Sequence, residues 1–111
     1  MKDLEPDIIS SVALLKALAN KRRLKIMYAL SEGEKSVGEL ETIVGISQSA
    51  LSQHLSRLRK EGIVNTRRSA QMIYYSTNNQ YAISILKCLK EIFSTAYDGT
   101  NDNANRISNS R

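Results

Sequence analysis

The sequence predicts a mainly helical α+β fold with about five helices and one two-stranded hairpin. Apolar residues recur at helical spacing along most of the chain. Two of the helical segments, 37–44 and 48–61, are separated by a short turn that contains Gly45. Two runs rich in β-branched and aromatic residues follow directly, at 63–67 and 72–76. A helix, a short turn, a second helix and then a hairpin are typical of a winged helix-turn-helix.

The first two helices are predicted from apolar spacing and from residues that begin or end helices. The first covers residues 7–19 and follows Pro6, which suits the first turn of a helix. Asn20 is expected to cap a second helix, which ends at residues 31–33. The apolar positions that define these two helices are Ile8, Val12, Leu15, Leu18, Leu24, Met27 and Leu30.

The next two helices carry the clearest local signals in the chain. Ser36 is expected to cap the third helix, and Glu39 stands where it completes a capping box. Gly45 ends this helix, because glycine adopts the left-handed conformation at low cost. Ser47 is expected to cap the following helix at 48–61, which the next glycine ends.

The C-terminal part is predicted to hold the hairpin, one more helix and a tail. The strands 63–67 and 72–76 are joined by a polar tip at 68–71. A last helix at 79–97 is indicated by the apolar stripe Ala82, Ile85, Leu89, Ile92 and Ala96. The polar segment 98–111 has little to bury and is expected to be disordered.

The length and composition predict one small intracellular domain that is not an enzyme. Of the 111 residues, 1–97 are expected to form this domain. The single cysteine rules out an intrachain disulfide, and we see no signal peptide or membrane-spanning run, so the expected location is the cytoplasm, at the nucleoid. The sequence has no glycine-rich phosphate loop and no paired carboxylates in an apolar setting, and no cofactor or metal is expected.

The net charge of +5 favours a polyanionic partner, and the positive charge is concentrated in the middle of the chain. Residues 26–49 hold one basic and four acidic groups, a net charge of −3. Residues 50–75 hold five basic groups and one acidic group, a net charge of +4. The basic segment therefore coincides with the predicted helix at 48–61 and the hairpin that follows it.

The helix at 48–61 is predicted to read DNA bases in the major groove. At 100° per residue its leucines gather on one face, and small polar residues lie opposite. Small side chains let the backbone approach the base edges, and a glutamine can make two hydrogen bonds to adenine. The residues predicted to face the bases are Gln48, Ser49, Ser52, Gln53 and Ser56.

A second set of residues is predicted to bind the DNA backbone. Arg67 and Arg68 flank the hairpin tip, where they can reach a phosphate. Ser47 begins a helix, and the free N–H groups at a helix N-terminus attract phosphate. The full set is Ser47, Lys21, Arg22, Arg57, Lys60, Arg67, Arg68 and Gln71. A solvated polar face is the competing interpretation of these residues. A non-regulatory module that binds nucleic acid is another alternative, although the outward face lacks the stacking aromatics usual in RNA-binding modules.

Apolar stripes on the first and last helices predict a homodimer, because one small domain does not need to cover both. The residues predicted to lie at the dimer interface are Ile8, Val12, Leu15, Ile85, Leu89 and Ile92. Cys88 lies on the same side of the last helix, either as a small buried hydrophobe or as a reactive thiol. His54 has two interpretations, packing within the domain or a phosphate contact.

The segments LLKALANKRRLKIMYAL and SVGELETIVGISQSALSQHLSRLRKEGIVNTRRSAQMIYYS give the chain a clear family likeness. Over residues 12–97 it resembles the ArsR family of bacterial winged-helix repressors. The likeness is strongest to the branch with the HlyU-type virulence regulators, the BigR-type biofilm regulators and the nodulation repressor NolR. The resemblance implies a homodimer that binds an imperfect inverted repeat in promoter DNA and blocks transcription.

The sensing residues of the family do not carry over. Ser36 and Gly38 stand where many metal sensors have a Cys-Val-Cys, and the last helix lacks the histidines of the zinc-binding members. Tyr28 and Ser94 stand where redox sensors of the nearest branch have cysteines. The resemblance therefore implies a regulator without the usual metal or dithiol site and with an unknown inducer, or one that responds to thiol chemistry through Cys88.

Overall fold

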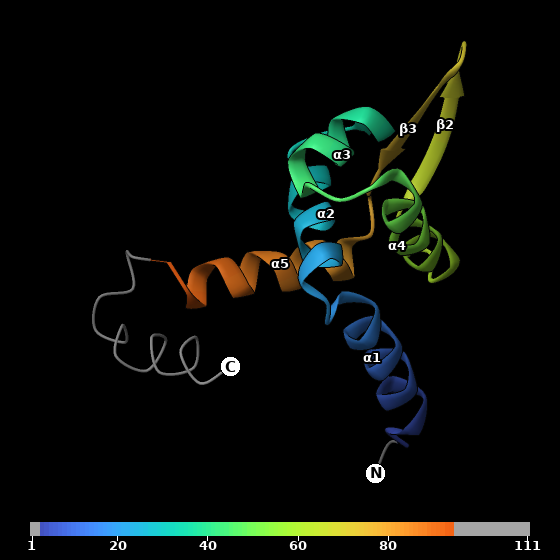
Figure 1. Ribbon diagram of the computed structural model, residues 1–111. Helices are drawn as coiled ribbons and strands as arrows, with labels where there is room; N and C mark the ends of the chain where they lie inside the picture. The colour runs from blue at the N-terminus through green and yellow to red at the C-terminus, as the bar shows by residue number, and fades with distance from the viewer. Residues whose placement is uncertain (1–2, 95–111) are drawn as a thin grey trace. The chain divides into compact units, whose positions relative to one another are not determined.

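The computed structural model describes residues 3–94 and contains five helices and a three-stranded sheet in that range (Figure 1). The chain divides into two compact units, Met1–Asn79 and Gln80–Arg111. The first unit holds four helices, α1 (Glu5–Leu18), α2 (Lys21–Ser31), α3 (Val37–Val44) and α4 (Gln48–Lys60). It also holds the strands β1 (Lys35–Ser36), β2 (Asn65–Ser69) and β3 (Met72–Ser76), and the second unit holds α5 (Gln80–Ile92). The predicted α+β winged helix-turn-helix is confirmed.

The helix starts follow the local chemistry that the sequence indicates. The side chain of Asn20 accepts hydrogen bonds from the backbone N–H groups of Arg22 and Arg23 and so caps α2. Ser36 caps α3, and its own N–H donates to Glu39, which completes the capping box. The hydrogen bond from the backbone N–H of Ser36 is the main reason why the pKa of the Glu39 carboxyl is lowered.

The capping box at Ser36 supplies a stability prediction. Ser36→Ala is expected to lower the free energy of unfolding by about 1 kcal/mol, because the N–H of Glu39 loses its acceptor, the Ser36 hydroxyl. Ser36 is only 5% exposed, so water does not readily replace this acceptor. Urea denaturation measures the difference. The matched control is Ser52→Ala at an exposed position within α4, where a change below about 0.5 kcal/mol is expected. Equal effects of the two substitutions would contradict the role of the cap.

The core of the first unit lies between α2, α3, α4 and the start of the hairpin. Its largest fully buried side chains are Ile26, Met27, Leu40, Val44, Leu51, Leu55, Leu58, Ile63 and Val64. α1 runs away from these helices, and only Ala17 and Leu18 at its C-terminal end are buried (Figure 1). Ile8, Ile9, Val12 and Leu15 are exposed in the single chain, while Ala13 and Leu14 are half-buried.

The sheet differs from the prediction in two respects. β1 was not predicted, because two residues are too few to produce an alternating pattern; it pairs with β3, and the strand order is β1-β3-β2. The hairpin begins at Asn65 rather than at residue 63, because the β-branched Ile63 and Val64 are buried in the core just before the strand. Pairing then continues to Ser69 and Met72, so the tip is only Ala70-Gln71, with Ala70 at a φ of 57°.

Two of the other predicted boundaries also shift. α1 begins at Glu5 rather than at residue 7, since Pro6 falls within its first turn. α5 ends at Ile92 rather than at residue 97; Ser94 and Thr95, which are weaker helix formers than the residues before them, follow in the sequence. The predicted stripe residue Ala96 and the predicted disordered tail at 98–111 lie outside the described residues.

Candidate nucleic-acid interface

The two faces of α4 are separated as the sequence predicts. Leu51, Leu55 and Leu58 are buried in the core. All five residues predicted to face the bases are exposed, namely Gln48, Ser49, Ser52, Gln53 and Ser56. The exposed face of α4 therefore offers short hydroxyl side chains and two amides. None of these groups takes part in the core packing, which the leucines on the opposite face provide.

The turn before α4 presents the N-terminus of this helix to solvent. Gly45 adopts the left-handed conformation with a φ of 75°, and its N–H donates to Glu41 at the end of α3. The Ser47 hydroxyl accepts from the N–H of Ala50 at 3.2 Å and so caps α4. The first N–H groups of a helix have no partner within it, so this exposed end of α4 can accept an anion.

The residues predicted to bind the DNA backbone are all exposed, but some of them already bind other groups within the protein. The guanidinium of Arg22 donates to the carbonyl of Val44 at 3.5 Å, which positions Arg22 beside the turn into α4. Arg57 lies 4.0 Å from the carboxylate of Glu61, one turn further along α4. Lys60 is exposed at the end of α4, and Gln71 is exposed at the hairpin tip.

Arg67 is held in place by two groups that sequence reasoning missed. Its Nε and Nη2 both donate to the carboxylate of Glu34 at 2.8 Å, and its guanidinium lies 4.4 Å from the centre of the Tyr74 ring. The hydrogen bond from Arg67 is the main cause that lowers the pKa of Glu34. Part of the donor capacity of Arg67 is thus used within the protein, whereas no carboxylate among residues 3–94 pairs with Arg68.

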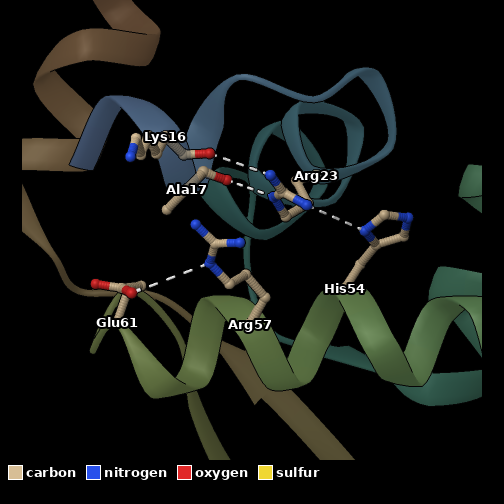
Figure 2. A network of polar contacts seen from close by, with 6 residues as sticks. All are labelled: Lys16, Ala17, Arg23, His54, Arg57 and Glu61. Atoms are coloured by element: carbon tan, nitrogen blue, oxygen red, sulfur yellow. Dashed lines mark hydrogen bonds and ion pairs between the residues drawn. The ribbon is translucent and has the colours of Figure 1, made fainter. Parts of the chain in front are cut away.

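A second polar network connects α1 with α4 through Arg23 (Figure 2). The Arg23 guanidinium donates to the carbonyls of Lys16 and Ala17, which end α1, and lies 3.5 Å from Nδ1 of His54 on α4. No local pattern in the sequence predicts this role of Arg23. His54 is half-buried in this network, which favours the packing interpretation over a phosphate contact.

The environment of His54 makes the stability of the fold dependent on pH. Burial, and then the charges of Arg23 and Arg22, lower the pKa of His54 from its usual 6.5. The unfolded chain therefore takes up this proton at a higher pH than the folded chain does. We expect the free energy of unfolding to decrease as the pH falls from 7.5 to 5.5, past the usual pKa of 6.5, because the unfolded chain takes up this proton first.

Urea denaturation across this pH range measures the effect of His54, and His54→Gln is expected to remove most of it. The carboxyls of Glu34 and Glu39 do not contribute in this window, because their pKa values are lowered from 4.5 and their stabilising effect is lost only at more acidic pH. An unchanged pH dependence in His54→Gln would show that another group is responsible.

The residues predicted at a dimer interface are accessible in the single chain. Val12 is 43% exposed, and Ile8, Leu15 and Ile92 are also exposed, while Ile85 and Leu89 are half-buried. Cys88 is exposed, so its interpretation as a buried hydrophobe is wrong for the single chain. The reason is its position about 160° around the helix from the buried Leu86.

The positions that the family resemblance aligns with sensing cysteines lie in different environments. Ser36 is buried and used as the cap of α3, while Gly38 is exposed on the same helix. Burial raises the pKa of the Tyr28 hydroxyl on α2, and Ser94 is half-buried after α5.

Within residues 3–94, no group of three His, Cys, Asp or Glu side chains is arranged to hold a metal ion. None of the helices in that range is long and apolar enough to cross a membrane.

Known proteins match both the sequence and this architecture. Residues 20–66 match the family model described as "Bacterial regulatory protein, arsR family". The chain is 42% identical to the transcriptional activator HlyU of Vibrio cholerae serotype O1, over 86% of this chain and 89% of the relative. It is 45% identical to the nodulation protein NolR of Rhizobium meliloti, over 83% and 75% of the two chains. Among solved structures, the transcriptional repressor BigR from Xylella fastidiosa aligns with a TM-score of 0.78 at 42% identity, covering 84% of this chain and 97% of that one.

Proposed function

Since the chain belongs to the ArsR family of bacterial regulatory proteins, we propose that this transcriptional regulator represses its genes by binding promoter DNA as a homodimer. The proposed site is an imperfect inverted repeat in double-stranded DNA, which a two-fold symmetric dimer matches. The single observation that carries the proposal is the exposed small-polar face of α4, with basic residues beside it and on the hairpin. The proposed location is the cytoplasm, at the nucleoid, without a membrane partner.

In this proposal α4 enters the major groove, and its exposed face contacts the base edges. The residues with this role are Gln48, Ser49, Ser52, Gln53 and Ser56. Backbone phosphates are bound by the capped start of α4, by the basic residues around it and by the hairpin. These residues are Ser47, Lys21, Arg22, Arg57, Lys60, Arg68 and Gln71, with Arg67 contributing the donors that Glu34 leaves free.

The dimer is proposed from the apolar surface that the single chain leaves exposed. On α1 this surface comprises the exposed Ile8, Val12 and Leu15, and on α5 it comprises the exposed Ile92 and the half-buried Ile85 and Leu89. Burial of apolar surface is the main driving force for association, and a small chain gains proportionally more from it.

The proposed regulator works without the metal or dithiol site of its relatives, and its inducer is open. The specific alternative is a response through Cys88, which the exposure of this thiol favours. Oxidation of the purified protein with and without Cys88→Ser distinguishes the two. A loss of DNA binding that the substitution prevents would favour the thiol response, and a loss that persists in Cys88→Ser would exclude it.

The experiment that tests the proposed function is selection of duplex DNA from a random pool by the purified protein, together with sedimentation. We expect an enriched sequence with two related, inverted half-sites and a particle of twice the chain mass. Structured RNA as a competitor tests the alternative of a general nucleic-acid module. Enrichment of a single half-site by a monomer, or equal competition by RNA, would contradict the proposal.

A further inference from the structure

A hollow of about 230 Å³ lies between the C-terminal part of α4 and one face of the hairpin. Thr66 and Arg68 on β2 stand opposite Tyr75 and Ile73 on β3, and strand alternation places these four on the same face. Alternation places Tyr74 and Arg67, whose guanidinium binds Glu34 and lies over the Tyr74 ring, on the opposite face, although Arg67 also borders the hollow. The residues that line the hollow are Arg59, Thr66, Arg67, Arg68, Ile73 and Tyr75.

The charge of this hollow is positive and uncompensated. The ion pairs among residues 3–94 are Arg57 with Glu61 and Arg67 with Glu34, so neither Arg59 nor Arg68 has a carboxylate partner. Ile73 and the ring of Tyr75 supply apolar lining beside the two arginines, which are themselves exposed. Two planar guanidinium groups and two hydroxyls beside an apolar wall form a suitable site for a phosphate group.

Arg59 also stands on the flank of α4 that leads to the base-reading face. At 100° per residue it lies within about 20° of Gln48 and of Ser52. Arg57 lies on another flank, towards Arg23 and the end of α1 (Figure 2). A nucleic-acid strand that passes between α4 and the hairpin would therefore meet Arg59 and Arg68 together.

We propose that this hollow binds one phosphate group, and that its occupant is a backbone phosphate of the bound DNA, held between Arg59 and Arg68. The inference rests on the proposed function, and it adds Arg59 to the interface as a phosphate-binding residue. It also separates the roles of two adjacent arginines. Arg68 binds the phosphate, whereas Arg67 fixes the hairpin through Glu34.

The first test needs no DNA, so its result is independent of the proposed function. Inorganic phosphate is titrated against chloride at constant ionic strength, and the Nε–Hε signals of the arginines are followed by NMR. We expect the signals of Arg59 and Arg68 to shift together and to saturate. The signal of Arg23, which is bonded to the end of α1, is the internal control and is expected to stay in place. Absence of a shared, saturable shift would overturn the phosphate site.

The second test is a salt titration of duplex binding by Arg59→Gln, Arg68→Ala and the double variant. Each phosphate that is neutralised contributes about one unit to the slope of log K against log salt. If one phosphate is held by both arginines, the remaining arginine still neutralises it in each single variant. The slope is therefore expected to fall by less than one in each single variant, and by about one rather than two in the double variant. Lys25→Gln, an equal charge change on the exposed side of α2, is the control and is expected to keep the slope.

The two tests together distinguish the possible failures. If phosphate saturates the arginine signals but the double variant binds DNA with an unchanged slope, the occupant is a free phosphorylated ligand and the DNA assignment is wrong. A slope that falls by two in the double variant would mean two separate phosphates and would overturn the shared site. If the wild-type chain binds no duplex, the proposed function fails while the NMR result still decides the phosphate site.

Discussion

Val12→Asp is expected to convert the protein into a folded monomer and to weaken binding to a two-half-site operator by about 10²- to 10⁴-fold. Val12 is 43% exposed in the single chain, so a charge there does not disturb the core. In a dimer the same side chain would be buried opposite its symmetry mate, where an unpaired carboxylate is strongly unfavourable. Without the dimer the two half-sites are bound independently, and the gain from linking them is lost. Sedimentation and operator titration measure the two effects.

Ser10→Asp is the matched control for this charge. Ser10 is exposed on the same helix but lies about 160° around it from Val12, away from the apolar stripe. We expect this variant to remain a dimer and to bind the operator as the wild type does. A Val12→Asp protein that still sediments as a dimer would contradict the proposed place of Val12 in the interface, and a Ser10→Asp protein that dissociates would show that the effect is not specific to the apolar stripe. Circular dichroism confirms that both variants are folded.

Gln53→Ala is expected to weaken operator binding by about 1–3 kcal/mol, which is about 5- to 150-fold, and to change binding to scrambled DNA little. Gln53 is exposed on α4, and alanine is a good helix former, so the helix itself is preserved. The loss is selective because a side chain that makes two hydrogen bonds to adenine contributes only where that base is present. Titration of the same protein with both duplexes measures the loss of specificity.

Arg68→Ala gives the contrasting result in the same assay. A residue that binds only phosphate contributes equally to both duplexes, so operator and scrambled DNA should be weakened by similar factors. If Gln53→Ala weakens both duplexes alike while Arg68→Ala affects only the operator, the assignment is reversed. The hairpin, rather than α4, would then read the bases.

The parts of the fold that could be predicted are those with signals in adjacent residues. The cap at Ser36, the turn at Gly45 and the cap at Ser47 each depend on chemistry within a few positions, so the helix-turn-helix followed from the sequence. The two faces of α4 followed from the 3.6-residue period in the same way. The exposure of its polar residues was therefore predictable, whereas their contact with DNA is a property of a complex.

The parts that could not be predicted depend on residues that are distant in the chain. Arg23 meets His54 across 31 positions, and Arg67 meets Glu34 across 33. No local pattern marks either pair, because each exists only after the helices and the hairpin have packed. The strand limits were misplaced for a related reason, since β-branched residues such as Ile63 and Val64 suit a buried connection as well as a strand.

The segment from Glu34 to Ser36 has a consequence for the thermodynamics of binding. Within three residues it bonds to Arg67 on β2, pairs with β3 and caps α3. The hairpin and the helix-turn-helix are thereby fixed to one short piece of backbone before any DNA arrives. Less conformational entropy then has to be lost when the complex forms, because the spacing between α4 and the hairpin is already set. A protein organised in this way selects DNA whose groove width fits that spacing, and deforming other sequences to fit it costs binding energy.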